Sequence, residues 1–342
     1  MNFNFPDNKL IDKGTICNRI GTSTFGELIN IAIPVDNQIS IDGTDFYFTY
    51  LKGADPGNKG GNSIILNLYA SQEIDLDNLE YGVPDLVLKI SKFRNSINPL
   101  FPNKKQKRFE KEIEALRKCN DEPFQNVIKI FHNGICKIKS SNNRFYDEHL
   151  YYTMEYAEYD LKSYIEAKHD ELSLDEKLSL CISICEGLKE LYSLEYYHRD
   201  IKPDNIFMID GLWKIGDLGL VAERNNSDEI DGVAEKIGPI GWLSPESMNK
   251  YLCEGKGFKF KHDFIIDHQS DIFQLGKVFW YIFQNNAPVG SIKISDFLIK
   301  QSNLYSVLRT MLNHSKRRRF KNVEEVIRIM KIVEKKILMV TN

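Results

Sequence analysis

Apolar residues recur with two different spacings along the chain, and the change between them falls near residue 160. Before it, short runs rich in apolar and β-branched residues predict strands at 45–51, 64–69, 86–90, 127–131 and 149–155. One charged amphipathic segment, 104–119, predicts a helix within this part. After it, apolar positions at helical spacing predict helices at 161–168, 174–194, 270–283 and 323–338. Strands followed by helices favour an α+β protein with two lobes.

Three further stretches contain many turn-forming or polar residues. Residues 16–34 predict a hairpin around a Gly- and Ser-containing turn at 21–26. Residues 52–62 are rich in Gly, Asn and Pro, and the acidic stretch 223–235 has no periodicity, so both predict loops.

The composition is that of an ordinary globular protein and argues against several classes. The 45 Lys and Arg nearly balance the 48 Asp and Glu, so we expect neither a nucleic-acid partner nor a membrane surface. The polar first residues and the absence of any run of about 18 apolar residues predict neither a signal peptide nor a membrane span. The six cysteines show no CxxC spacing, which favours reduced thiols in a cytoplasmic protein.

The strongest chemical signal is the run His-Arg-Asp-Ile-Lys-Pro-Asp-Asn at 198–205, followed by Asp-Leu-Gly at 217–219. These segments resemble the catalytic loop and the metal-binding segment of eukaryotic-type protein kinases. The resemblance implies a bilobal kinase fold, with a small antiparallel β lobe carrying one helix, a large mainly α-helical lobe and ATP between them. It also implies that Asp200 orients the substrate hydroxyl and Lys202 steadies the γ-phosphate, while Asn205 and Asp217 hold Mg²⁺, with Mn²⁺ as the alternative metal.

The strand-like run Leu-Val-Leu-Lys at 86–89 resembles the family strand that carries the ATP-binding lysine. By this resemblance Lys89 contacts the α- and β-phosphates and pairs with a glutamate of the following helix, for which Glu112 fits best. Val87 stands where the family usually has alanine against adenine, and its larger side chain is expected to tighten that pocket.

Two other segments complete the implied ATP site. Gly-Thr-Ser-Thr-Phe-Gly at 21–26 resembles the Gly-rich loop, whose backbone must approach phosphates closely, although serine replaces the middle glycine. Tyr-Tyr-Thr-Met-Glu-Tyr-Ala at 151–157 resembles the last small-lobe strand and the hinge. The nucleotide contacts expected from these segments and from the strand after the catalytic loop are Ile20, Gly21, Ser23, Gly26, Leu28, Met154, Glu155, Ala157 and Phe207.

Two positions resemble residues that support the large lobe of kinases. Glu246, within Ser-Pro-Glu at 244–246, is expected to pair with an arginine of the run 317–319. Asp271 is expected to support the catalytic loop from a helix. Small-molecule kinases of the aminoglycoside type share an HxDxxxxN loop but lack this Pro-Glu segment and helix, so the resemblance favours a protein substrate.

Two residues point to different substrate hydroxyls. Lys202 is similar to the lysine of serine/threonine kinases, whereas Pro239 stands where those enzymes usually have threonine and resembles the tyrosine-kinase segment. Because Lys202 lies at the phosphoryl group, we expect serine/threonine specificity, with dual specificity as the alternative. Ser23, Val87 and Leu218 depart from the family pattern and keep open a pseudokinase that binds nucleotide without turnover.

Arg199 stands where the family often binds a phosphate of the activation loop. Between Asp217 and Glu246 the only hydroxyl residues are Ser227 and Ser244, and five acidic residues share the segment. We therefore expect activation either by phosphorylation of Ser227 or without any phosphorylation.

The resemblance divides the chain as follows. Residues 1–13 are an N-terminal extension, 14–336 the kinase domain and 337–342 a tail. Within the domain we expect a small lobe at 14–155 with an insertion at about 35–82, a hinge at 155–159 and a large lobe at 160–336. The expected partners are ATP and a protein substrate, with a transient homodimer during autophosphorylation.

Overall fold

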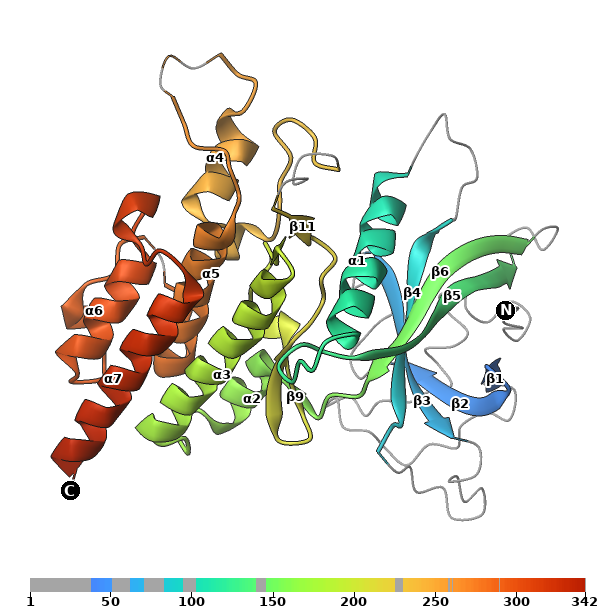
Figure 1. The fold of residues 1–342 in the computed structure, drawn as a ribbon, viewed down its shortest axis with the longest axis horizontal. Coiled ribbons are helices and arrows are strands. Elements are labelled where there is room, and N and C mark those ends of the chain that lie inside the picture. The colour runs from blue at the N-terminus through green and yellow to red at the C-terminus, as the bar shows by residue number, and fades with distance from the viewer. Residues whose placement is uncertain are drawn as a thin grey trace, which may run out of the picture. The chain divides into compact units, whose positions relative to one another are not determined.

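The computed structural model describes residues 38–50, 62–70, 83–94, 103–139, 146–224, 230–257, 259, 261–288 and 290–341, which form an α+β protein (Figure 1). The described residues fall into two compact units. The first comprises those up to residue 113 together with 129–156, and the second comprises 114–128 together with those from 157 onward.

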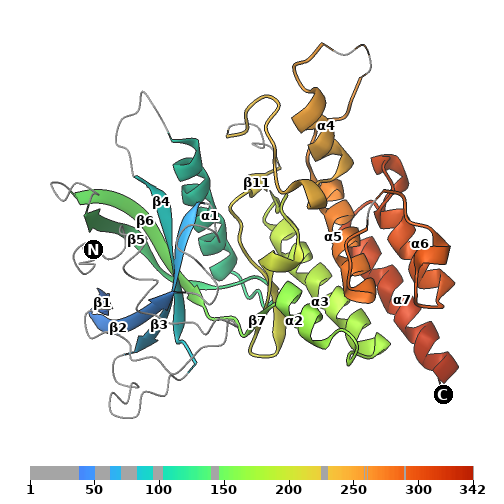
Figure 2. The same ribbon diagram turned by 180° about the vertical axis from the view of Figure 1, so that it is seen from behind.

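The first unit contains a six-stranded antiparallel sheet in the order β1-β2-β3-β4-β6-β5 (Figures 1 and 2). Its strands are β1 (Gln38–Ile41), β2 (Thr44–Tyr50), β3 (Ser63–Ala70), β4 (Leu86–Arg94), β5 (Ile130–Lys139) and β6 (Tyr146–Glu155). Alternation along β3 and β4 buries Leu66, Leu68, Leu88 and Ile90 on one face, where they pack with Phe48. This cluster is the core of the unit.

The stretch interpreted as an insertion, 35–82, supplies three of these strands. β3 pairs with β4 so that Asn67 lies opposite Val87 and Ile65 opposite Lys89. Phe48 and Leu68 have no exposed surface. The described residues of this stretch are therefore part of the sheet and not a mere surface excursion, while the hairpin predicted at 16–34 lies outside the described residues.

Helix α1 (Lys104–Asn120) follows the first four strands, one residue longer than the sequence predicts. Its apolar positions Phe109, Ile113 and Leu116 are buried, as the amphipathic pattern requires. The helix brings Glu112 against β4 and β6, where its side chain contacts Lys89 and Tyr152.

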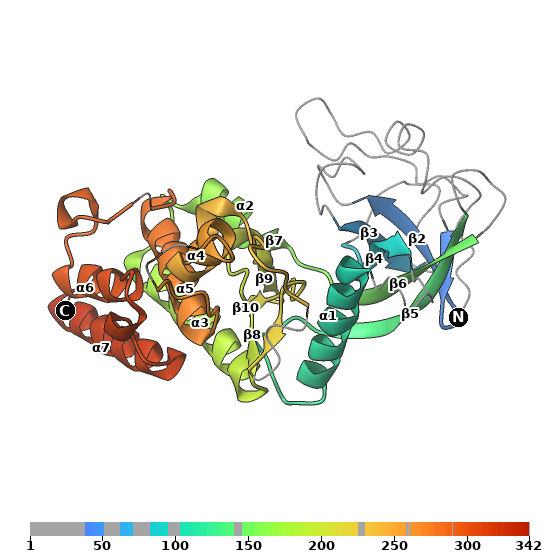
Figure 3. The same ribbon diagram turned by 90° about the horizontal axis from the view of Figure 1, so that it is seen from above.

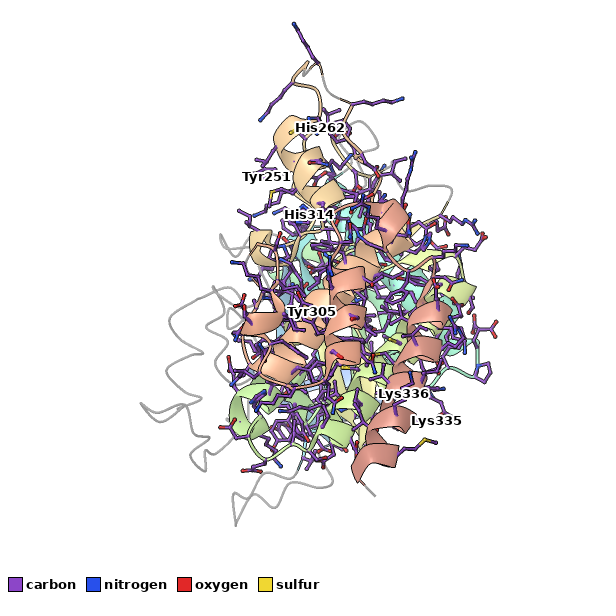
Figure 4. All side chains as sticks on the ribbon, turned by 90° about the vertical axis from the view of Figure 1, so that its left-hand side faces the viewer. Tyr251, His262, Tyr305, His314, Lys335 and Lys336 are labelled. Atoms are coloured by element: carbon purple, nitrogen blue, oxygen red, sulfur yellow. The ribbon has the colours of Figure 1, made fainter. Side chains whose placement is uncertain are left out.

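The second unit is mainly helical (Figure 3). Its helices are α2 (Leu161–Lys168), α3 (Leu174–Ser193), α4 (Pro245–Cys253), α5 (His268–Gln284), α6 (Ser302–Met311) and α7 (Val323–Thr341). Helix α5 is buried along almost its whole length, because α3, α4 and α6 all pack against it. In α6, the Tyr305 hydroxyl donates to the Ile292 carbonyl oxygen at 3.1 Å. On α7, Lys335 and Lys336 are exposed (Figure 4).

Short strands and turns connect these helices. The strands are β7 (Tyr159–Asp160), β8 (Tyr196–Tyr197), β9 (Ile206–Ile209), β10 (Leu212–Ile215) and β11 (Ala222–Glu223). They form a three-stranded sheet, β10-β9-β7, and the pair β11-β8. Single 3₁₀ turns lie at Pro203–Asn205, Ile240–Trp242, Ile294–Asp296 and Lys316–Arg318.

One predicted strand differs from the structure, and two helices were not predicted. The strand predicted at 127–131 begins only at Ile130, since Val127 makes an isolated bridge to Ile215. Helices α4, of nine residues, and α6, of ten, were not predicted. Among the described residues, no helix is long and apolar enough to cross a membrane.

If β2 and β3 are integral to the first unit, truncating their core side chains must destabilise it. We expect Leu68→Ala to lower the free energy of unfolding by about 2–5 kcal/mol, because it removes a fully buried side chain and leaves a cavity. The control Asp45→Ala, at an exposed position of β2, should change it by less than about 0.5 kcal/mol. Equal effects in urea unfolding would contradict this role of the sheet.

Candidate active site

The first unit contributes a buried ion pair between a strand and a helix. Lys89 Nζ on β4 lies 2.8 Å from Glu112 Oε1 on α1, and the two side chains are 9% and 1% exposed. The Tyr152 hydroxyl donates to the same Glu112 oxygen at 3.0 Å. Lys89 Nζ also lies 5.6 Å from the Tyr152 ring centroid and 5.9 Å from that of Phe109. The ion pair with Glu112, which Tyr152 also contacts, fixes the position of the Lys89 ammonium group.

The residues expected near adenine lie on several strands. Val87 on β4 is paired with Met154 on β6, and Glu155 ends that strand. Ala157 belongs to the second unit, where Phe207 lies on β9. The Phe207 ring packs on Gly216 so closely that a Cβ there would lie 2.9 Å from it, which is why this position is glycine.

Asp200 has one oxygen bound and one without a partner. Its Oδ2 accepts hydrogen bonds from Lys202 Nζ at 2.8 Å and from Asn205 Nδ2 at 3.1 Å. Its Oδ1 is buried and has no hydrogen-bond partner. Burial raises the pKa of Asp200 to about 6, while Lys202 opposes that shift. The carboxyl group therefore has one fixed oxygen and one available to accept a proton from a substrate.

Helix α5 holds the loop that carries Asp200. The carboxylate of Asp271 accepts the backbone N–H groups of His198 at 2.8 Å and Arg199 at 2.7 Å. One turn later, Gln274 Oε1 accepts from the Ile201 N–H at 3.1 Å, and its Nε2 donates to the Arg199 carbonyl oxygen at 3.2 Å. These bonds compensate for the unfavourable positive φ of 66° at Arg199.

His198 adds a second support from inside the loop. Its Nε2 lies 3.1 Å from the Gly216 carbonyl oxygen, and its Nδ1 accepts the Asp200 N–H at 3.2 Å. Only the neutral ring with a proton on Nε2 satisfies both contacts. Burial lowers the pKa of His198 to about 4, which agrees with that neutral form.

Asn205 and Asp217 supply oxygen atoms of the kind that Mg²⁺ prefers. The Asn205 amide nitrogen is committed to the Asp200 carbonyl oxygen at 2.8 Å, which leaves its Oδ1 as the ligand atom. Asp217 has a positive φ of 53°. Among the described residues, no group of three His, Cys, Asp or Glu could hold a metal, but Mg²⁺ in phosphoryl transfer needs only one or two protein ligands besides the phosphates. The residues thus fit this ion.

Glu246 is fixed by one arginine of the run 317–319. Arg319 Nη2 and Nη1 donate to Glu246 Oε1 at 2.8 Å and Oε2 at 3.1 Å, and the side chains are 0% and 3% exposed. The Ser270 hydroxyl donates to the same carboxylate at 3.1 Å. Because α4 begins at Pro245, this ion pair ties the start of that helix to α5 and to the 3₁₀ turn before α7.

The structure thus brings the catalytic-loop residues together, and it also brings together Lys89 and Glu112; their roles stay predictions. Sequence reasoning missed Gln274 and Tyr152 as partners in these networks. A polar residue one turn after Asp271, between the apolar Phe273 and Leu275, was the available signal for Gln274. The expected contacts Ile20, Gly21, Ser23, Gly26 and Leu28, and the candidate phosphosite Ser227, lie outside the described residues.

Removing Arg319 should be far more costly than removing its neighbours. We expect Arg319→Ala to lower the free energy of unfolding by about 3–5 kcal/mol, because it leaves the Glu246 carboxylate buried and unpaired. Arg317→Ala and Arg318→Ala are matched controls at exposed positions and should cost less than about 0.5 kcal/mol each. Similar losses for all three in chemical denaturation would show that the pairing with Glu246 is unimportant.

The neutral, buried His198 predicts acid destabilisation. Its pKa is about 6.5 when unfolded and about 4 when folded, so unfolding takes up a proton between these values. This contribution to stability is full above pH 6.5 and is lost as pH falls toward 4, by about 3 kcal/mol. Urea unfolding at several pH values gives the free energy of unfolding of the parent protein and of His198→Gln. The difference between the two should decrease as pH falls, because pH effects of the other groups cancel in it. A difference that does not vary with pH would contradict the assignment.

Comparisons with known proteins agree with this geometry. Residues 96–338 match the family model described as the protein kinase domain. The match begins after Lys89, so β4 and everything before it lie outside the matched region.

Several curated proteins resemble part of the chain. It is 30% identical over 202 residues to a sensor for unfolded proteins in the ER, ire1, from Schizosaccharomyces pombe, which covers 53% of this chain and 18% of the relative. It is 23% identical over 192 residues to the dual specificity protein kinase TTK of Mus musculus, covering 52% and 22%. It is 29% identical over 138 residues to the protein sevenless of Drosophila virilis, covering 36% and 5%. The aligned regions span well under half the length of each relative.

The matched region contains the catalytic loop, Asp217, Glu246 and the helix that supports them, in the two-unit α+β arrangement described above. This chain belongs to the protein kinase family.

Proposed function

We propose that this protein kinase transfers the γ-phosphoryl group of ATP to serine and threonine hydroxyls of protein substrates. The observation that carries the proposal is the carboxyl group of Asp200, with Oδ2 held by Lys202 and Asn205 and a buried Oδ1 that has no hydrogen-bond partner. A preorganised acceptor of this kind orients an incoming hydroxyl for in-line attack.

In the proposed reaction, the residues of each unit have separate roles. Lys89, fixed by Glu112, binds the α- and β-phosphates, and Lys202 binds the γ-phosphate. The substrate hydroxyl donates a hydrogen bond to Asp200 Oδ1. Its oxygen forms a bond to the γ-phosphorus as the bond to the bridging oxygen of ADP breaks, and the proton passes to Asp200. Mg²⁺, held by Asn205 and Asp217 when bound, neutralises charge on the phosphates.

Gly238 supports the assignment of Asp200 as the acceptor. Its φ is 97°, and a Cβ at this position would lie 3.3 Å from Asp200 Oδ1. The segment between Asp217 and Glu246, here called the activation segment, therefore passes directly over Asp200 Oδ1. It limits the space in which a substrate hydroxyl fits.

Serine/threonine specificity rests on Lys202. Its Nζ lies 2.8 Å from Asp200 Oδ2, where it can contact both the acceptor group and the transferred phosphoryl group. Dual specificity is the second candidate, because Pro239 has no hydroxyl to donate to Asp200 and one similar protein is named as a dual specificity kinase. A pseudokinase is less well supported, since every polar position of the catalytic motifs is filled.

Replacing the acceptor carboxyl group tests catalysis. With radiolabelled ATP and Mg²⁺, we expect Asp200→Asn to lower the initial rate of phosphoryl transfer to itself or to a generic protein by about 10²- to 10⁴-fold. The matched control is Asp210→Asn, in the exposed β9–β10 turn, where both residues tolerate the positive φ of 49°. ATP binding without transfer in the parent protein would instead support a pseudokinase.

The same labelled product decides the specificity. We expect phosphoserine and phosphothreonine after acid hydrolysis, in both the autophosphorylated protein and the generic substrate. Phosphotyrosine alongside them would establish dual specificity, and phosphotyrosine alone would overturn the assignment based on Lys202.

A further inference from the structure

The activation segment offers little opportunity for phosphorylation. Ser227 and Ser244 are its only hydroxyl residues between Asp217 and Glu246. Ser244 is the N-cap of α4, where its hydroxyl accepts the Ser247 N–H at 3.2 Å, and it is 0% exposed. A kinase cannot reach that hydroxyl in the folded protein, so Ser227 is the remaining candidate.

The guanidinium group of Arg199 already has an anionic partner. Its Nη1 lies 2.5 Å from Asp231 Oδ2 and its Nη2 lies 3.3 Å from Asp231 Oδ1, a bidentate ion pair. The side chains are only 4% and 2% exposed. Arg199 Nε donates to the Leu220 carbonyl oxygen at 2.7 Å. All three guanidinium nitrogens are thus bound within the second unit.

Other carboxylates fix the same segment. Glu235 accepts the Gly232 N–H at 2.7 Å, and Glu254 of the α4 C-terminus accepts the Ala234 N–H at 2.8 Å. Glu254 also pairs with Lys250 at 3.1 Å. The segment at 230–235 is therefore held at both of its ends by charged side chains.

The cations at and next to this ion pair are already paired with carboxylates. A hollow of about 370 Å³ is lined by Arg199 with Asp231, by Lys250 with Glu254, and by apolar side chains of 264–266. Each of the two cations carries a carboxylate partner. A phosphate here would have to displace a buried carboxylate or add an unbalanced charge, and both are costly.

We propose that Asp231 serves as a built-in anion that fixes the activation segment to Arg199, so that this kinase is active without phosphorylation of the segment. Asp231 is a positioning residue and acts through Arg199 on the neighbouring Asp200. The connection is short, since Arg199 is bound to α5 through both its N–H and its carbonyl oxygen, and Gly238 of the same segment lies over Asp200. The inference rests on the proposed kinase activity.

The first arm of the test needs no change at the ion pair. The parent protein is treated with phosphatase, mass spectrometry verifies that residues 217–246 carry no phosphate, and initial rates on a generic protein substrate are measured. We expect the treated protein and Ser227→Ala to keep the rate of the untreated parent. A rate that falls on dephosphorylation, or in Ser227→Ala, would overturn the proposal in favour of a phosphate at Ser227.

The second arm removes the built-in charge. We expect Asp231→Asn to lower kcat roughly 5- to 150-fold, the usual range for coupling between two sites, and Asp231→Glu to restore much of it. The matched control Glu235→Gln neutralises a second carboxylate of the same segment but keeps an oxygen that can accept the Gly232 N–H, and it should keep the parent rate. An Asp231→Asn protein as active as the parent would overturn the proposal.

A double-mutant cycle separates the positioning role from a general loss of structure. If Asp231 acts through Arg199, Asp231→Asn should have no further effect on kcat in the Arg199→Gln background. Additive losses would overturn the proposed route. Thermal unfolding checks that each variant is folded, and the phosphatase arm decides the question should Asp231→Asn fail to fold. A parent protein inactive under all conditions would refute the proposed function itself, a result distinct from each of these.

Discussion

The carboxylate of Asp271 accepts two backbone N–H groups from the catalytic loop, and the position of Asp200 in the second unit depends on these bonds. A buried carboxylate is costly unless donors surround it, and the amides of His198 and Arg199 supply them at 2.8 and 2.7 Å. In return the loop is bound to α5, the most completely buried helix described. Asp200 is the next residue along, so its carboxyl group is positioned by the core of the unit.

Each unit contains buried ion pairs whose members come from distant parts of the chain. Lys89 pairs with Glu112, Arg199 with Asp231, and Glu246 with Arg319. Each pair carries additional hydrogen bonds, which is the condition under which buried charges are tolerated. Such pairs have strict geometry and so determine where β4, the activation segment and α4 lie relative to their immediate neighbours.

The catalytic loop could be predicted from sequence because its residues are contiguous and their chemistry requires a fixed spacing. The Lys89–Glu112 pair could also be predicted, because 86–89 and the helix around Glu112 resemble the family's lysine strand and the helix that follows it. Arg319 could not be chosen among three adjacent arginines, because burial alone distinguishes it from the exposed Arg317 and Arg318. Asp231 was one of five acidic residues in a segment without periodicity, and only the folded chain shows which of them faces Arg199. The place of residues 38–70 in the sheet was likewise hidden, because strand pairing depends on partners far along the chain.

The pairing of β3 with β4 extends the folded sheet beyond the region that matches the family model. The strand that carries Lys89 is bound on one side by β6, within the region that matches the family, and on the other by β3, which lies before it. A piece of the chain cut at residue 96 would keep the catalytic loop and lose Lys89, its strand and seven of the nine buried residues in the apolar cluster of the sheet. The stretch that matches the family model is therefore shorter than the stretch whose strands share one apolar core.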